Sequence, residues 1–334
     1  MNKAALKRMT RRTEFYMFLV LIVLIAVIAI VSKGALFEPT QVVTILRAMV
    51  VDGMFALGCL VVMISGGFDM SFPAIAAMAY SLATTICLNQ GWCQTSPIAA
   101  FALSVIFGAI LGMFNGWIIS NFKLNTMIVT LGTQTFFTGI SMGLLKLKEI
   151  TSTLPEGMKT FGKLYIFESA DPASGIRFTL SAMVLFLIAL CAIVSFMLNK
   201  TMFGRALYAI GGNEVSAERA GYNVKKTKFL LYSAVGALAG FIGMIRVCME
   251  SQSIPKAMIG KEMTIIPAVI LGGASIYGGE GTVFGTMVAV GIISLVSNSM
   301  LILGIDTYWQ QFFNGLVILV GVTVSALQAK RQKQ

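Results

Sequence analysis

The sequence predicts an all-α polytopic membrane protein, and three observations support this fold class. Only 12% of the 334 residues are charged, against roughly 25% in soluble domains. Apolar residues make up 57% of the chain, and the mean hydropathy is +0.85. Apolar runs of about 20 residues, the length that crosses a bilayer, follow one another with short connections. This composition excludes a disordered chain, a nucleic-acid-binding module and an ordinary cytosolic enzyme.

The apolar runs are numerous enough for about ten transmembrane helices. The first, 15–31, is uncharged and is not followed by the small-residue cleavage site of a signal peptide, so we expect a retained span. The run 263–277 is short and glycine-rich, which favours a re-entrant or broken segment. The other spans are expected near 42–64, 73–88, 97–120, 125–145, 178–198, 229–249, 282–303 and 308–327.

The distribution of basic residues predicts the orientation of the chain. With both termini in the cytoplasm, inside segments hold 15 lysines and arginines and outside segments hold eight. Because cytoplasmic loops are enriched in basic residues, we expect both termini inside. The chain then divides into a cytoplasmic basic tail at 1–14, one transmembrane domain at 15–327 and a cytoplasmic tail at 328–334. Two long loops interrupt the domain, a cytoplasmic one at 199–228 and an extracytoplasmic one at 146–177.

The sequence lacks the residues of a metalloenzyme or an ATPase. It contains no histidine, and its five cysteines form no C-x-x-C pair. The apolar runs hold no pair of acids suited to hydrolysis, so we expect neither enzymatic activity nor a metal site. The glycine-rich stretch 272–285 lacks the lysine of a phosphate-binding P-loop. We therefore expect no ATP or other cofactor on this chain.

A first motif lies between the runs 42–64 and 73–88. Its paired glycines, Gly66 and Gly67, free the backbone from helical dihedrals. Asp69 and Ser71 can satisfy the unpaired N–H groups of the next helix, which would make this segment a capped inter-helix turn. Alternatively, it is a broken helix that lines a translocation path. Both interpretations remain open from the sequence.

A second glycine-rich motif contains Gly272, Gly273 and Ser275. Six glycines in fourteen residues disfavour a continuous helix, so this is either a plain connection or a broken helix near a pore. Residues 64–69 resemble 270–275, and 114–116 resemble 313–315, which predicts two pseudo-repeated halves. The candidate path residues, which include three amides in the expected spans, are Gly66, Gly67, Asp69, Ser71, Asn115, Gly272, Gly273, Ser275, Asn298 and Asn314.

Amides and hydroxyls outnumber charges among the polar groups at membrane depth. This balance favours a neutral polyol or sugar over an ion as the transported solute. Arg47 and Asp52 are five residues apart and cannot share one helix face, so each must find its own partner in the bundle. Small residues at helical spacing, as in Gly108, Gly112 and Gly116, predict close helix packing.

The cytoplasmic loop 199–228 mixes apolar, aromatic and charged residues. A short helix can begin at Asn213 and end before Gly221, and Glu214 in its first turn suits the helix dipole. Such a helix can dock on a partner or lie on the membrane, and the alternative is a solvated loop. The residues that we assign to coupling with a partner are Gly204, Arg205, Gly211, Gly212, Asn213, Glu214 and Gly221.

Three stretches, 66–71, 203–221 and 271–281, resemble in order and spacing the permease subunits of ribose-type ABC sugar importers. The resemblance covers nearly the whole chain and implies the type II-like fold of such permeases in a bacterial cytoplasmic membrane. It also implies a second permease copy or paralogue around a central path. An extracytoplasmic binding protein would deliver the sugar, and a cytoplasmic ATPase would bind ATP and dock on the 199–228 loop. Lipid is the expected solvent, and no nucleic-acid partner is expected.

Two other classes of protein compete with this interpretation. An ion-coupled secondary transporter usually carries buried carboxylates or histidines, and here only Asp52 and Asp69 could serve. An intramembrane enzyme would need a catalytic constellation that the sequence lacks.

Overall fold

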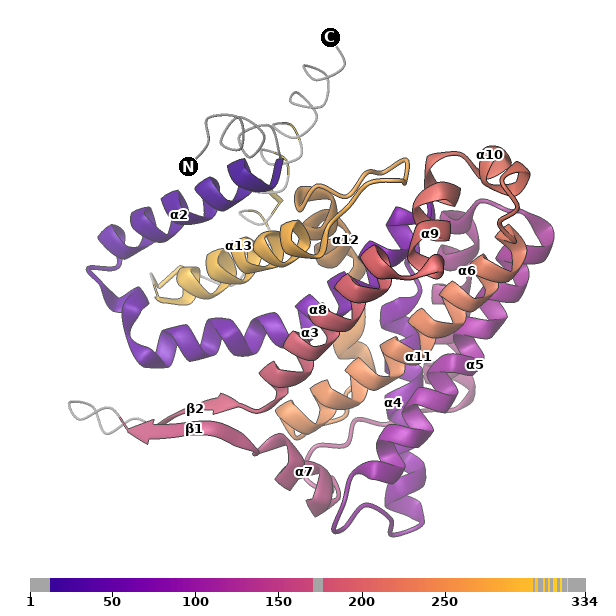
Figure 1. Ribbon diagram of the computed structural model, residues 1–334. Coiled ribbons are helices and arrows are strands. Elements are labelled where there is room, and N and C mark those ends of the chain that lie inside the picture. The colour runs from indigo at the N-terminus through magenta and orange to yellow at the C-terminus, as the bar shows by residue number, and fades with distance from the viewer. Residues whose placement is uncertain are drawn as a thin grey trace.

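The computed structural model is a helical bundle with a single β-hairpin in the part of the chain that it describes (Figure 1). It describes residues 13–170, 177–302 and 304–305, together with residues 309, 312, 315, 316, 319 and 323. The elements in chain order are α2 (Thr13–Val31), η1 (Ala35–Phe37), α3 (Pro39–Ile64), α4 (Phe72–Asn89), α5 (Ile98–Phe122), α6 (Thr126–Gly139), η2 (Ile140–Leu144), α7 (Glu156–Gly162), β1 (Tyr165–Ala170), β2 (Arg177–Ser181), α8 (Met183–Lys200), α9 (Met202–Gly212), α10 (Glu214–Arg219), α11 (Val224–Glu250), η3 (Pro255–Met258), α12 (Glu262–Leu271) and α13 (Val283–Ile302).

The predicted polytopic fold is confirmed. Seven of the described helices are long and apolar enough to cross a membrane, namely α3, α4, α5, α6 with η2, α8, α11 and α13. The N-terminal helix α2 is also apolar, although its described side chains cover only Met17–Val31. The expected span 308–327, and with it Asn314, lies outside the continuously described residues, as do the N-terminal residues 1–12 and the tail 328–334.

The run 263–277 is broken, as its glycine content favoured, because α12 ends at Leu271 and its ten residues extend only about 15 Å, half the hydrocarbon thickness. Another sequence expectation needs correction. The run 178–198 begins as a strand, because β2 pairs antiparallel with β1 before α8 starts at Met183. The apolar residues of β2 continue into those of α8, so hydropathy alone did not separate them.

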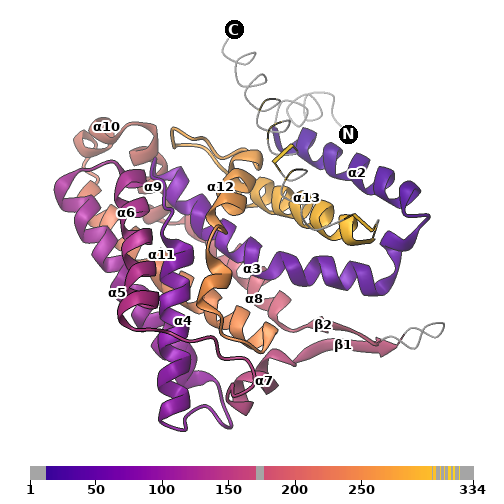
Figure 2. The same cartoon turned by 180° about the vertical axis from the view of Figure 1, so that it is seen from behind.

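The connections gather at two opposite ends of the bundle (Figures 1 and 2). One end carries α9, α10 and the glycine-rich connection between α12 and α13, while α7 and the β-hairpin lie at the other. At this second end, Ile150 and Ser253 exchange backbone hydrogen bonds of 2.9 and 2.8 Å. The amide of Gly157 donates to the Cys93 carbonyl at 3.1 Å, which fastens α7 to the loop after α4.

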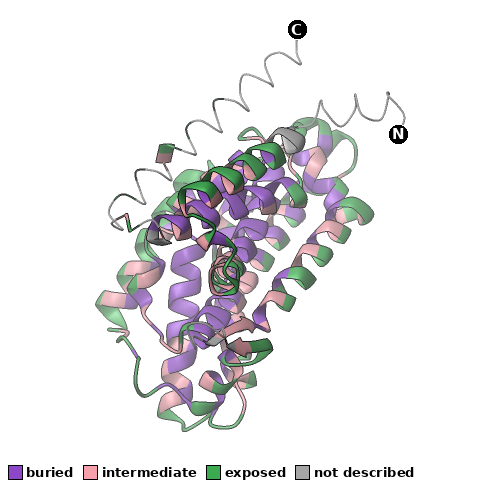
Figure 3. Ribbon diagram, turned by 90° about the vertical axis from the view of Figure 1, so that its left-hand side faces the viewer, coloured by how far each residue is buried: buried purple, intermediate pink, exposed green. Residues whose placement is uncertain are grey.

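The helices form an inner and an outer layer (Figure 3). In α3, α4, α11 and α13 between 61 and 72% of the most apolar window is buried, whereas in α5, α6 and α8 only 22 to 28% is buried. Apolar residues on the outer helices, such as Ile188 and Phe196, are well exposed. An exposed apolar surface of this kind is stable only against lipid or another apolar partner.

Helices α5 and α11 form the most extensive helix pair. A Cβ on Gly108 or Gly112 would overlap the carbonyl oxygens of Gly236 and Tyr232, respectively. The Ser104 hydroxyl donates to the Gly240 carbonyl at 2.7 Å across the same contact. The small residues therefore allow backbone contact along the pair, as the spacing predicted.

The charges inside the bundle have partners, as expected. Arg47 donates to the Met249 carbonyl at 2.5 Å, so its positive charge lies at the end of α11. Asp52 accepts from the Lys261 ammonium at 2.9 Å. Arg246 pairs with Glu250 one turn later in α11, at 2.5 Å. Arg47 and Asp52 thus find partners on other elements, and Arg246 finds one in its own helix.

Candidate functional site

Three sequence motifs that lie far apart in the chain meet backbone to backbone. Gly66 follows the end of α3, Gly211 lies in the last turn of α9, and Gly278 lies in the connection between α12 and α13. A Cβ on Gly278 would be 2.6 Å from the Gly66 Cα, and one on Gly211 would overlap the Ile64 carbonyl oxygen. A side chain larger than hydrogen cannot fit at Gly211 or Gly278, and Gly66 has a φ of +77°, which favours glycine. The glycine junction therefore depends on the residue types at all three positions.

Hydrogen bonds hold the glycine junction together. The Gly279 amide donates to the Ile64 carbonyl at 2.9 Å. The Tyr208 hydroxyl, on α9, donates to the Gly281 carbonyl at 2.9 Å. Burial raises the pKa of Tyr208, so the phenol keeps its proton and remains a donor. The glycine-rich connection is therefore hydrogen-bonded both to the end of α3 and to α9.

Helices α9 and α10 form the unit predicted in the 199–228 loop. The Asn213 side chain accepts from the Ser216 amide at 2.8 Å and begins α10. Gly221, with φ of +90°, follows its end, which is the stop signal that the sequence indicated. Ile210, Ala217 and Val224 form a small buried cluster that joins α9, α10 and α11. The solvated-loop alternative is wrong for these residues.

The coupling residues divide into buried and exposed positions. Gly204 is buried where α9 turns against the end of α8, and a Cβ there would lie 2.5 Å from the Leu198 carbonyl oxygen. Glu214 pairs with Lys228 of α11 at 2.6 Å, so it also holds α10 in place. Arg205, Gly212 and Asn213 are exposed. The exposed positions are the ones that a partner can reach.

The exposed side of this unit includes two apolar residues that the sequence analysis missed. Val215 on α10 is 57% exposed, and Tyr277, at the tip of the glycine-rich connection, is 91% exposed. The backbone carbonyl of Tyr277 lies at the glycine junction, 3.6 Å from a Cβ built on Gly66. Val215 and Ala217 are two residues apart, so they lie on different faces of a short helix. The sequence thus indicated that one of them is exposed, and the structure shows that it is Val215.

The first motif forms a buried polar network. The Asp69 carboxylate accepts from the Ser71 amide at 2.7 Å and from the Ser71 hydroxyl at 2.6 Å. The Asn115 amide of α5 donates to the same hydroxyl at 2.7 Å. All three side chains are buried, so in this conformation they connect α4 and α5. Their assignment to the translocation path stays a prediction.

Two threonines of α6 hold the irregular backbone of this motif. The Thr126 hydroxyl accepts from the Phe68 amide at 2.9 Å, and the Thr130 hydroxyl accepts from the Met70 amide at 3.1 Å. Non-helical backbone at membrane depth must find such partners because lipid offers none. The backbone between α3 and α4 is thus interrupted, which both sequence interpretations required, and the choice between them stays a prediction.

The remaining path candidates lie apart from this network. Gly272 packs against α13, where a Cβ would be 2.7 Å from the Gly285 carbonyl oxygen. Gly273, with φ of +92°, follows the end of α12, and Ser275 hydrogen-bonds within the glycine-rich connection. The Asn298 amide donates to the Ser294 carbonyl in its own helix. The structure therefore brings Asp69, Ser71 and Asn115 together but not these residues.

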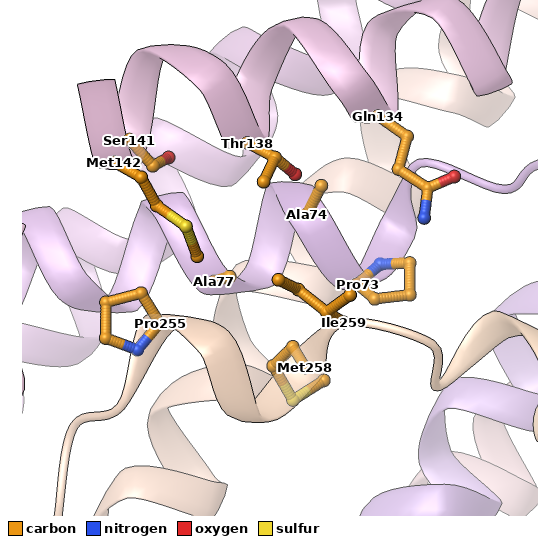
Figure 4. A pocket seen from close by; sticks show the side chains of 10 residues that line it. All are labelled: Pro73, Ala74, Ala77, Gln134, Thr138, Ser141, Met142, Pro255, Met258 and Ile259. Carbon is orange, nitrogen blue, oxygen red and sulfur yellow. The ribbon is translucent and has the colours of Figure 1, made fainter. Parts of the chain in front are cut away.

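A pocket opens between α4, α6 with η2, and η3 (Figure 4). Gln134, Thr138 and Ser141 contribute polar groups along one wall, and Met258 lies on the opposite wall. The Gln134 amide also donates to the Glu262 carboxylate at 2.6 Å. Its volume of about 30 Å³ has room for water but not for a sugar in this conformation. Among the described residues, no cluster of cysteine, aspartate and glutamate is arranged to hold a metal ion.

Comparison with known proteins identifies the family. Residues 41–322 match the model of the family described as branched-chain amino acid transport system / permease component. The chain belongs to this family. The permease is 34% identical over 289 residues to the ribose import permease protein of Bacillus subtilis strain 168, covering 86% of this chain and 85% of that protein.

Two further relatives support the same assignment. The ribose import permease protein of Escherichia coli K12 is 30% identical, with 86% of each chain covered. The xylose transport system permease protein of Haemophilus influenzae is 27% identical, covering 89% of this chain and 92% of the relative. The resemblance to sugar ABC importer permeases is therefore confirmed. The chain is a multi-pass transport permease, and the relatives are transport permeases and not enzymes.

Proposed function

We propose that this permease forms the path through which an ABC importer moves a monosaccharide, and that a separate ATPase drives it by docking on α9 and α10. The observation that carries the proposal is the glycine junction. It connects the exposed docking unit directly to the interruption after α3 and to the glycine-rich connection before α13.

The junction supports a mechanical account of coupling. Packed backbones move as rigid bodies, because any separation would expose unpaired N–H and C=O groups. A push on α10 passes through the small core of Ile210 and Ala217 to α9. From Gly211 it reaches the end of α3 and, through Gly279, the start of α13. Differential binding of ATP to the partner then favours one of two arrangements of these helices.

The docking surface consists of Arg205, Gly212, Val215 and Tyr277. It combines an exposed valine, an exposed tyrosine, an exposed arginine and a glycine with open space beside it. Aromatic residues and arginine are enriched at the centres of protein interfaces, which supports a protein partner here. We assign this end to the cytoplasm, because the predicted inside segments carry 15 basic residues against eight outside. Both termini are then cytoplasmic.

The substrate class follows from the relatives and from the polar groups of the bundle. The relatives named above import ribose or xylose, which are neutral pentoses. Polar groups buried in the bundle include the hydroxyl of Ser71 and the amide of Asn115, which are neutral. We therefore propose a pentose or a similar polyol, delivered by an extracytoplasmic binding protein to a pair of permease chains in the bacterial cytoplasmic membrane.

The ion-coupled alternative has no support. The carboxylate of Asp52 is already paired with Lys261, and Asp69 is hydrogen-bonded within a buried network. An ion-coupling carboxylate must instead gain and lose its ion during each cycle.

Uptake measurements separate the two mechanisms. The permease is reconstituted in liposomes with candidate ATPase subunits and binding proteins, and uptake of radiolabelled ribose and xylose is measured without an ion gradient. We expect uptake only with ATP inside the liposomes and a loaded binding protein outside. Uptake that follows a proton or sodium gradient and ignores ATP would contradict the proposal.

A further inference from the structure

Two cysteines lie in contact at the end of the bundle opposite α9 and α10. Cys87 is in the last turn of α4, and Cys93 is in the loop that follows. Their sulfur atoms are 3.1 Å apart, and both residues are buried. We propose that Cys87 and Cys93 are joined by a disulfide in the protein at the membrane.

The loop after α4 is shaped so that the two sulfurs face each other. The Trp92 amide donates to the Cys87 carbonyl at 2.8 Å and folds the chain back on the helix end. Gly91 and Cys93 adopt positive φ values of +67° and +64°, which complete the reversal. Disulfide sulfurs are about 2.05 Å apart, so a further approach of about 1 Å forms the bond.

The pair is distinct from the other cysteines. Cys59, Cys191 and Cys248 are also thiols in transmembrane helices, but none makes a sulfur–sulfur contact among the residues that the structure describes. Among the described residues, the pair belongs to no group of three or more cysteine, aspartate or glutamate side chains that could hold a metal ion.

The location of the pair supplies the oxidising environment. The Cys93 carbonyl accepts from Gly157 of α7, so the loop belongs to the end that carries the β-hairpin. The proposed function assigns this end to the extracytoplasmic side, and the inference rests on that orientation. Disulfides form and persist in the bacterial periplasm and at cell surfaces, whereas cytosolic thiols are kept reduced.

The chemistry balances as a thiol–disulfide exchange. One thiolate of the pair attacks the disulfide of an extracytoplasmic oxidant protein, and a mixed disulfide forms. The second thiolate then displaces the oxidant's sulfur. Cys87 and Cys93 lose two electrons and two protons in total, and the oxidant protein becomes a dithiol.

The bond would stabilise the loop after α4, against which α7 packs. A Cβ on Gly157 would be 2.5 Å from the Cys93 carbonyl oxygen and 2.6 Å from the Ser96 amide, so α7 packs directly on this loop. A covalent closure over seven residues removes alternative conformations of the loop that would break this contact.

Counting thiols tests the inference. The full chain with Cys59→Ala, Cys191→Ala and Cys248→Ala keeps only the pair. Cells are quenched with acid, the protein is denatured with N-ethylmaleimide present, and new thiols are tagged with a polyethylene-glycol maleimide with or without prior reduction. We expect two tags after reduction and none without it. The Cys93→Ser variant of the same chain is the matched control and should carry no tag in either case, since its single thiol is blocked at once.

A second arm tests the orientation separately. A cysteine at Gln90 in a cysteine-free chain is labelled in intact cells with a membrane-impermeant maleimide. Labelling from outside, together with no tags on the pair after reduction, would overturn the disulfide and leave the orientation standing. Labelling only after permeabilisation would overturn the orientation in the proposed function, and the tag count then still decides the disulfide by itself.

Discussion

Gly211 and Gly212 are neighbours in sequence but have opposite surroundings. A Cβ on Gly211 would overlap the Ile64 carbonyl oxygen and lie 2.6 Å from the Gly279 amide nitrogen. A Cβ on Gly212 would have no atom within 4 Å. The first glycine is therefore a packing residue of the glycine junction. The second is open on the side that the proposed ATPase approaches.

This contrast predicts different consequences of substitution. Gly211→Ala should destabilise the permease by about 1–3 kcal/mol, because backbone atoms rather than flexible side chains must move. Gly212→Trp should leave the melting temperature of the detergent-solubilised protein unchanged. It should lower ATP-driven uptake by roughly tenfold while ATP hydrolysis continues, since coupling between sites typically amounts to 1–3 kcal/mol.

The control is Gly212→Ala, which adds a small side chain in the same open space. It should retain both stability and coupled uptake. The assignment of Gly212 to the docking surface would be wrong if Gly212→Trp transported at the rate of the unmodified protein, and wrong also if its only defect were a lower melting temperature.

At the level of elements, the α5–α11 pair shows how close two helices come in this bundle. Gly112 faces the α11 backbone, where a Cβ would overlap the Tyr232 carbonyl oxygen and lie 2.8 Å from the Gly236 Cα. Gly143, in η2, has the same small-residue spacing to Gly139, but a Cβ there meets nothing within 4 Å. The same spacing of glycines thus brings α5 into backbone contact with α11, whereas Gly143 in η2 contacts no described residue in this way.

Alanine substitution distinguishes these two cases. Gly112→Ala should cost about 1–3 kcal/mol by forcing α5 and α11 apart. Gly143→Ala should change stability by less than about 0.5 kcal/mol, as is usual for exposed positions. Thermal unfolding of the purified protein measures both. Equal melting temperatures for the two variants would refute the backbone contact between α5 and α11.

At the scale of the whole molecule, local signals were readable in the sequence and long-range contacts were not. Asn213 and Gly221 marked the two ends of α10 because helix caps depend only on adjacent residues. The interruption after Leu271 followed from the local density of glycine. The contact between Gly66, Gly211 and Gly278 could not be predicted, because a single sequence does not indicate which distant glycines lie together in the fold.

The errors also have physical causes. Hydropathy assigned 178–198 to one helix because the strand β2 and the start of α8 are both apolar. The pairing of β2 with β1 depends on backbone hydrogen bonds, which a hydropathy pattern does not detect. Among the candidate path residues, Asp69 and Asn115 were recognised as polar groups at membrane depth, but only the fold joined them through Ser71.

The two ends of the bundle allow a direct test of its orientation. Ser216 on α10 and Ser152 before α7 are both exposed and lie at opposite ends. If basic residues orient the chain as proposed, a cysteine at Ser152 should react with an impermeant maleimide in intact cells. A cysteine at Ser216 should react only after permeabilisation, because the membrane separates it from the reagent.

The two labels must behave oppositely. Helices α4, α5, α6, α8 and α11 run alternately from one end of the bundle to the other, and α8 lies between Ser152 and Ser216 in the chain. Reaction of both sites in intact cells would contradict a bundle that spans the membrane between them, and the reverse pattern would place the proposed docking surface on the wrong side for a cytoplasmic ATPase.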